Sequence, residues 1–500
     1  MSTKKQTTAT AQSQTSEKDF SLGLELDDKA QELETQREEH EQNLARYTFN
    51  RILGAVKPKD DLILNYIMEK GRGLDKKLRE IVWHAVQEAA DGDLMSREYR
   101  ERRKSEQRII VYNGRYWEKS DQQMWQHYMN LFTQKVGIPE VFCKDPAFMK
   151  KVWEQTAFTL FEWRNRFIPK DEVWLNMHNG TLVIRSDGSM PTLRDHRRDD
   201  MFFYALGYNY DSQTECPMWQ AFLDRNVPEA EAQMVLAEFI GYALTRKHFL
   251  NKMLWMIGAG ANGKSVVLEI IEALLGADNV SNLSLSDLTG DPTKRVGIEG
   301  KLLNISYETG KEVRADVMKL LSAGEPVTVK YLYEDPYTTR DYGQFAAAFN
   351  VLPKAEITGA FFRRLIVMPY DVIIPDDEQD KKLAEKLKKE ELPGILNWVI
   401  KALQGLMQRE AFTHSEMCEK ALAQYRMQSD SVSMFVHEMC EKQEYTMRGD
   451  ELFSAYKKYC YDSNLTALGK GNFYKRLDQH THSREDVGRV VFFHLKLVES

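Results

Sequence analysis

The sequence predicts an α/β protein of several domains, and three observations lead to that prediction. The chain has 500 residues, too many for one ordinary domain, and its 42% hydrophobic and 29% charged residues are typical of a globular protein. Apolar strand-like segments alternate with helical ones from about residue 252 to residue 371, as in a parallel sheet. A glycine-rich loop joins the first of these strands to a helix.

Composition excludes several classes of protein. No apolar stretch reaches the ~18 residues of a membrane helix, and the N-terminus lacks the apolar segment of a secretory signal, so we expect a cytoplasmic protein with no membrane partner. Five cysteines without a CxxC pair predict neither a disulfide framework nor a zinc cluster. The net charge of −7 excludes a globally basic nucleic-acid coat but is compatible with a local basic channel.

The N-terminal part of the chain is predicted to contain little packed structure at its start. Residues 1–26, which begin with a run rich in Ser, Thr and Gln, are expected to be a disordered tail. Residues 27–104 are expected to be a helical region: 27–47 is predicted to be a solvated helix or a loosely packed arm, and apolar residues recur at helical spacing in 62–90. The charged run REYRERRK at 97–104 is predicted to be a solvated helix before a strand, with a phosphate-contacting face as the alternative.

The next part, residues 105–228, is predicted to be a small α+β domain. The turn pairs Asn113-Gly114 and Asn179-Gly180 each separate two short strand-like segments. The parallel-sheet core is expected at 229–375, followed by helices at 376–426 that complete it.

Residues 427–500 are predicted to fold as three helices and a terminal strand, which suggests a winged-helix-like domain. Three basic residues lie near its predicted recognition helix or wing, namely Lys470, Lys475 and Arg476. They could contact duplex DNA, although lysines on any exposed helix would give the same pattern.

The glycine-rich segment GAGANGKS at 258–265 fits the P-loop pattern GxxxxGK[ST] without a mismatch. An apolar strand precedes it and a helix with an apolar stripe follows it, which is the context that a P-loop requires, whereas a tight turn with an incidental lysine is the alternative. In a P-loop the backbone N–H groups face phosphates, Lys264 contacts the β- and γ-phosphate oxygens, and Ser265 is a Mg²⁺ ligand. The residues expected to bind ATP are Gly258, Ala259, Gly260, Ala261, Asn262, Gly263, Lys264, Ser265 and Val266.

Polar residues next to three further strands are candidates for catalysis. Glu308 closely follows an apolar segment and is predicted to bind a metal or activate water, with an ordinary surface carboxylate as the alternative. Asn350 follows the next strand and would reach the same edge, where its amide could bond the γ-phosphate and the attacking water, with a simple strand-ending asparagine as the alternative. Arg363 and Arg364 precede an apolar strand and are either an arginine finger acting across a subunit boundary or an internal ion pair.

Together these segments resemble the superfamily 3 helicases of viruses, phages and plasmids, and most closely the phage and plasmid primase-type helicases related to satellite-phage and poxvirus primase–helicases. The resemblance runs from roughly residue 105 to residue 460, and the order and spacing of its motifs match the family throughout. The motifs are WLNMHNGTLVI, CPMWQAFL, EFIGYALT, GAGANGKS, LLNISYETG, LSAGEPVTVKYLYEDPY, FNVLP and FFRRLIVMPY.

This resemblance implies an AAA+-like P-loop NTPase core, preceded by a helicase-associated α+β domain and followed by a winged-helix-like domain. The roles that it implies are Walker A for Gly263, Lys264 and Ser265, Walker B for Glu308, sensor for Asn350, and finger for Arg363 or Arg364. It also implies that residues 327–337 form a hairpin in a central channel, with Lys330 gripping DNA phosphates and Tyr331 stacking on bases. Tyr307 departs from a two-acid Walker B pattern, so Glu308 would serve both metal and water.

The implied function is that of an ATP- and Mg²⁺-dependent DNA helicase of a mobile element, acting as a homo-hexamer on single-stranded DNA at a replication fork or origin. The chain shows neither a Cys cluster nor an obvious paired-Asp strand, so we expect a helicase without a primase domain and a separate primase or initiator protein as a partner. Two alternatives stay open: a P-loop phosphotransferase for a small molecule, and a DNA-binding initiator whose ATPase only drives assembly.

Overall fold

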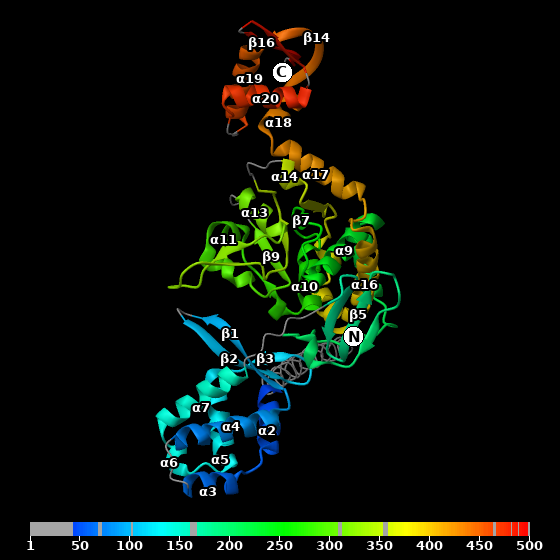
Figure 1. Ribbon diagram of the computed structural model, residues 1–500. Helices are drawn as coiled ribbons and strands as arrows, with labels where there is room; N and C mark the ends of the chain where they lie inside the picture. The colour runs from blue at the N-terminus through cyan, green and yellow to red at the C-terminus, as the bar shows by residue number, and fades with distance from the viewer. Residues whose placement is uncertain are drawn as a thin grey trace, which may run out of the picture. The chain divides into compact units, whose positions relative to one another are not determined.

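The computed structural model describes residues 44–68, 73–101, 104–160, 168–308, 313–353, 359–463, 467–481, 483–488 and 490–498 (Figure 1). The chain divides into two compact units: unit 1 comprises Met1–Phe167 and Asp195–Ala205, and unit 2 comprises Ile168–Arg194 and Leu206–Ser500. The tail expected at 1–26 lies outside the described residues. Residues 105–228, expected to form one domain, contribute to both units.

Unit 1 is built from helices packed around the base of a small antiparallel sheet. Its core holds apolar residues at helical spacing, such as Leu78, Val82 and Val86, together with Phe132 and Val152 from other helices. Its elements are α2 (Leu44–Ala55), α3 (Asp60–Met68), α4 (Leu74–Ala90), β1 (Leu94–Glu101), β2 (Lys104–Tyr112), β3 (Trp117–Lys119), α5 (Gln122–Val136), α6 (Glu140–Cys143) and α7 (Pro146–Thr159).

The helix predicted at 97–104 is wrong, because the structure places the described part of this run, residues 97–101 and 104, in the hairpin formed by β1 and β2. The two strands pair antiparallel from Leu94 opposite Val111 to Glu101 opposite Lys104. Leu94 and Val111 are buried at the base of the hairpin, where they join the core of unit 1. A run of charged residues has no apolar periodicity of its own. Its structure is therefore determined by the buried Leu94 and Val111 and by the pairing with the next strand.

Unit 2 begins with an antiparallel meander and two helices. The strands are β4 (Glu172–Met177), β5 (Gly180–Arg185) and β6 (Thr192–Arg194), and the helices are α8 (Pro217–Asn226) and α9 (Ala230–Thr245). The buried Glu391 carboxylate accepts hydrogen bonds from the backbone N–H groups of Met218 and Trp219, both at 2.8 Å. This carboxylate caps the first turn of α8 and ties that helix to the start of α16 (Leu392–Arg409).

The centre of unit 2 is a five-stranded parallel sheet with the order β13-β7-β12-β9-β8. Its strands are β7 (Met253–Ile257), β8 (Val280–Ser281), β9 (Leu303–Glu308), β12 (Gln344–Phe349) and β13 (Leu365–Pro369). The predicted α/β class with a parallel sheet is therefore confirmed. The connecting helices are α10 (Lys264–Leu275), α11 (Leu285–Gly290), α12 (Pro292–Arg295), α13 (Ala315–Ser322) and α14 (Gly359–Phe362).

Trp255 of β7 is the centre of one face of this sheet. Its ring centroid lies 4.9 Å from that of Phe349, 5.7 Å from Phe361 and 5.8 Å from Tyr425. Helical segments complete the unit: α15 (Leu383–Glu390), α16 (Leu392–Arg409) and α17 (Glu416–Gln428). A short antiparallel hairpin, β10 (Val327–Val329) with β11 (Tyr337–Thr339), stands apart from the sheet.

Residues 431–497 form three helices and an antiparallel sheet of order β14-β16-β15 around an aromatic core. The elements are α18 (Ser431–Met439), β14 (Cys440–Arg448), α19 (Gly449–Asp462), α20 (Lys470–Thr481), β15 (Arg484–Val487) and β16 (Val490–Leu497). The helices and the last strand match the sequence prediction, whereas β14 and β15 were not predicted. In the described ranges, no helix combines the length and apolar character that crossing a bilayer requires.

Candidate functional site

The loop between β7 and α10 has a backbone conformation that its glycines explain. Gly260 and Gly263 have φ values of 81° and 84°, in the left-handed region that side chains rarely adopt. A Cβ on Gly258 would overlap the carbonyl oxygen of Tyr370, and one on Gly263 would lie 2.7 Å from the Phe222 ring. The loop therefore packs so closely against α8 and the end of β13 that only glycine fits at these two positions.

Lys264 lies at the first turn of α10, and its side chain turns back into this loop. Its Nζ donates hydrogen bonds to the Gly258 carbonyl oxygen at 2.6 Å and to Asn262 Oδ1 at 3.0 Å. The Asn262 amide in turn donates to the Tyr370 carbonyl oxygen at 2.8 Å. Burial lowers the pKa of Lys264, whose two hydrogen-bond partners are neutral oxygens. An anion bound in the loop would stabilise this buried ammonium, so the loop is suited to phosphate.

The carboxyl ends of three neighbouring strands meet beside the loop. Phe349 of β12 is in register with Ile257 of β7 on one side and with Glu308 of β9 on the other. The loop, Asn350 and Glu308 thus follow the same row of the sheet, as expected for parallel strands. Asn350 is exposed, and only the backbone of Glu308 belongs to the described structure.

Tyr307 occupies the position where a two-acid pattern would have its first carboxylate. Its side chain is 52% exposed. Burial of its remaining surface and the charges of Glu272 and Glu269 raise the pKa of the phenol above its ordinary value. The phenol therefore stays protonated near neutral pH and cannot replace a carboxylate as a metal ligand.

The two arginines do not share this edge. Both precede β13, and the backbone oxygen of Arg364 accepts a hydrogen bond from Met253 N at the start of β7, at 2.8 Å. The five residues of β13 separate them from the phosphate-type loop, a distance of roughly 16 Å at about 3.3 Å per residue. Arg363 is exposed, whereas Arg364 donates from Nη1 to the Ala360 carbonyl oxygen at 2.7 Å.

The β10–β11 hairpin has a tip that the sequence prediction missed. Tyr331, which the resemblance assigns to base stacking, stacks on Tyr337 with ring centroids 6.1 Å apart and an interplanar angle of 21°. Lys330 is half-buried. The exposed tip consists of Leu332 and Tyr333, which are 65% and 73% exposed, and Tyr333 has a φ of 67° that a tyrosine rarely adopts. Large side chains next to the turn-forming Glu-Asp-Pro sequence were the signal that could have identified this tip.

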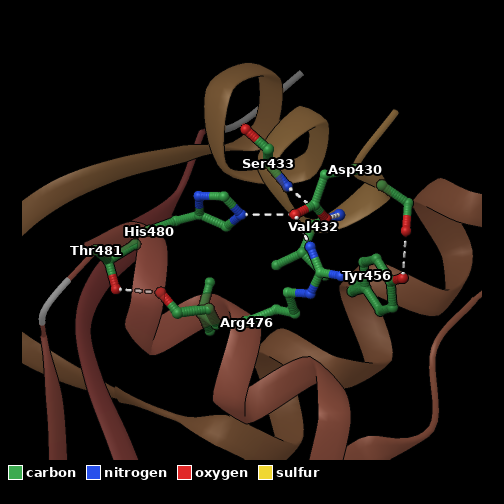
Figure 2. A network of polar contacts seen from close by, with 9 residues as sticks. Asp430, Val432, Ser433, Tyr456, Arg476, His480 and Thr481 are labelled. Carbon is green, nitrogen blue, oxygen red and sulfur yellow. Dashed lines mark hydrogen bonds and ion pairs between the residues drawn. The ribbon is translucent and has the colours of Figure 1, made fainter. Parts of the chain in front are cut away.

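Two of the basic residues proposed for duplex contact in the C-terminal module are bound within it. Asp430 accepts hydrogen bonds from Arg476 Nη1 at 2.7 Å and from His480 Nε2 at 2.8 Å, as Figure 2 shows. Lys470 forms an ion pair with Asp450. The contacts of Arg476 and Lys470 are thus internal to the module, which favours a structural role, while Lys475 is exposed.

Asp430 also caps α18, since its carboxylate accepts from the backbone N–H of Val432 at 3.0 Å. Burial would raise the pKa of Asp430, but the His480 hydrogen bond and the Arg476 charge outweigh it and lower that pKa to about 2.

Replacing Asp430 with Asn should therefore destabilise α18 by about 1 to 2 kcal/mol at neutral pH. The carboxylate has a lower pKa when folded than its ordinary 3.8, so its stabilisation is present above pH 3.8 and is lost as the pH falls through about 2. Hydrogen exchange of the α18 amides measures the effect, with the exposed Asp486→Asn as control. Equal exchange in Asp430→Asn and wild type at neutral pH would contradict the assignment.

Comparison with known families gives matches to three separate parts of the chain. Residues 92–228 match the family described as D5 N terminal like, and residues 427–493 match the family described as Poxvirus D5 protein-like. Residues 256–364, which contain the glycine-rich loop, β9, β12 and Asn350, match a family of unknown function (DUF5906).

Similar proteins include L207/L206 of Acanthamoeba polyphaga mimivirus, which is named as a candidate helicase. It is 23% identical over 338 residues, which is 60% of this chain and 34% of the relative, so the chain spans about a third of that protein's length. Solved structures with similarity include the A form apo structure of the NrS-1 C-terminal region (305–718), with a TM-score of 0.43 and 8% identity over 78% of this chain and 94% of that chain. A further apo structure of the same region has the same values. The two D5-type family matches and the mimivirus relative show that this chain resembles the phage- and poxvirus-type primase–helicases.

Proposed function

We propose that this chain is an ATP-dependent DNA helicase of a phage, plasmid or integrated island, and that it moves along single-stranded DNA as a ring during replication. The observation that carries the proposal is the division of its polar residues between the carboxyl-terminal and the amino-terminal ends of the strands of one sheet. The Lys264 loop, Asn350 and Glu308 lie at the carboxyl-terminal ends of their strands. Arg363 lies at the other end, just before β13 begins. A complete site then requires Arg363 from a neighbouring copy.

The loop and its surroundings fit ATP with Mg²⁺. Ser265, exposed at the first turn of α10, and Glu308 are the residues that would hold the metal, which neutralises charge on the phosphate oxygens when bound. Lys264 would bind the β- and γ-phosphates, and the Asn350 amide would orient the attacking water. Glu308 would accept the proton of that water, because no second acid precedes it in the strand.

The strand order supports an AAA+-like core. Because β12 lies between β7 and β9, Asn350 emerges between the phosphate loop and Glu308, where a sensor of the γ-phosphate is required. We assign 229–375 to this core, 376–426 to its helical completion, and 427–500 to a winged-helix-like domain. The helicase-associated domain would come from 105–228.

The β10–β11 hairpin would contact DNA in the channel of a hexamer. Lys330 and Tyr331 are the residues that the family resemblance assigns to this contact. We add Tyr333, since it is the more exposed of the two large side chains at the tip. A few phosphate contacts per copy give binding that is sensitive to salt and neutral to sequence.

We expect Tyr333→Ala and Lys330→Ala to keep basal ATP hydrolysis and to lose its stimulation by single-stranded DNA. Tyr333 is 73% exposed on a hairpin outside the sheet, so its removal should leave the nucleotide site intact. ATPase assays with and without an oligo(dT) measure both quantities, with the exposed Tyr461→Ala as a matched control. Stimulation equal to wild type in both variants would remove the hairpin from the mechanism.

Measurement of ATPase with and without single-stranded DNA, together with unwinding of a forked duplex, tests the function itself. A helicase is stimulated and unwinds. A small-molecule phosphotransferase does not respond to DNA, and an initiator whose ATPase only drives assembly binds DNA without unwinding it. A separate primase or initiator protein and origin DNA are the further partners that we propose.

A further inference from the structure

Unit 1 has a concavity of about 480 Å³ that the proposed ATPase site does not use. It is lined by Arg79 of α4 and by Lys151, Glu154, Gln155 and Phe158 of α7. All five residues belong to unit 1, so the concavity is formed by one folded unit.

Phe158 provides an aromatic surface at this concavity. Its side chain is 72% exposed, although α7 contributes other apolar residues such as Phe148 and Val152 to the core. Leaving this ring in water forgoes the stabilisation that its burial would give to the folded protein. A flat aromatic surface can stack on any nucleic-acid base.

Two cationic side chains lie beside that ring. Arg79 Nε donates to Gln155 Oε1 at 3.3 Å, which orients the guanidinium at the concavity. Lys151 is exposed and follows Lys150, whose Nζ lies 3.9 Å from the carboxylate of Glu154. Lys150 thus offsets the single negative charge of the lining, and the local balance is positive.

The β1–β2 hairpin neighbours the concavity, because α7 packs against both β1 and β2 as well as α4. Residues 96–108 carry six Lys or Arg and three Glu, a difference of +3 in a chain whose net charge is −7. The apolar anchors of the hairpin lie at its base, in Leu94, Met95 and Ile109. A polyanion is the partner that this charge favours.

We propose that the concavity of unit 1 binds single-stranded nucleic acid, with a base stacked on Phe158 and adjacent phosphates bound by Arg79 and Lys151. An aromatic platform next to cations is the usual combination in sites for single strands, whereas duplex bases are already stacked on each other. The contact needs neither ATP nor the channel hairpin. It is therefore a second nucleic-acid site, on a different unit from the ATPase.

Crosslinking in the full chain without ATP tests this site. The background is Lys330→Ala/Tyr333→Ala, which removes the proposed channel contact, and the probe is an oligo(dT) that contains 5-iodouracil. We expect the crosslinked peptide to contain Phe158, and we expect Phe158→Ala to weaken binding about tenfold. Lys151→Glu should also weaken binding and reduce its dependence on salt.

Val141→Ala and Lys144→Glu are matched controls, since both residues are exposed in unit 1 outside the concavity, and neither should change affinity. Crosslinks confined to other peptides, equal affinity of Phe158→Ala and the background, or tighter binding of a duplex of equal length would overturn the proposal. Because ATP is absent, failure of the helicase proposal would leave the expected crosslink unchanged.

Discussion

Lys264→Ala should reduce the rate of ATP hydrolysis by at least about 100-fold. Lys264 is 7% exposed, and its ammonium is already held at the loop by the Gly258 carbonyl oxygen and the Asn262 amide oxygen. Such a preorganised charge needs little rearrangement to stabilise the charge that develops on the transferred phosphoryl group. Steady-state ATPase measures this loss.

Lys386→Ala is the matched control for this substitution. Lys386 is a half-exposed lysine of the same unit that pairs with Asp380 at 2.7 Å, and it should leave the rate unchanged. Binding of a fluorescent ATP analogue distinguishes lost chemistry from lost folding, because Lys264→Ala also removes two hydrogen bonds within the loop. Retention of more than a tenth of the wild-type rate would rule out Lys264 as the phosphate-binding lysine.

Arg363→Ala should lower ATP hydrolysis about 1,000-fold, and mixing it with Lys264→Ala protein should restore part of the activity. Arg363 lies at the amino-terminal end of the strands and the Lys264 loop lies at their carboxyl-terminal end, so one copy cannot bring both groups to one nucleotide. In a mixed ring, an Arg363→Ala copy supplies the intact loop and its Lys264→Ala neighbour supplies the arginine. Random mixing in equal amounts makes about one interface in four complete.

The control for this experiment is Arg364→Ala mixed with Lys264→Ala. The Arg364 guanidinium donates within its own copy to the Ala360 carbonyl oxygen, so its loss should not be complemented by a neighbour. Recovery with Arg364→Ala but not with Arg363→Ala would exchange the roles of the two arginines. No recovery with either variant would show that the nucleotide site is not shared between copies.

The parallel sheet could be predicted because its strands are continuous apolar runs separated by helices. The common edge of Glu308 and Asn350 follows from the same pattern, since the carboxyl ends of parallel strands meet. The β1–β2 hairpin could not be predicted from 97–104 alone, because the charged β1 is held in place by pairing with β2, the strand that contains Ile109 and Val111. Local sequence gives no signal for such pairing.

Contacts between side chains that are distant in the sequence could not be predicted either. Tyr331 and Tyr337 are six positions apart, and only the turn of the hairpin brings their rings together, which leaves Tyr333 at the tip. Arg476 has the sequence character of an exposed basic residue, yet its partner Asp430 is 46 positions away. The sequence identifies the residue types at the candidate site, whereas their partners are determined by the fold.

The mass of the particle in solution, measured with a non-hydrolysable ATP analogue and a single-stranded oligonucleotide, tests most directly whether neighbouring copies share the nucleotide. We predict a closed assembly of several copies, a hexamer, that forms with both ligands and is weakened by Arg363→Ala. A protein that remains monomeric under these conditions while it hydrolyses ATP at its full rate would contradict this mechanism.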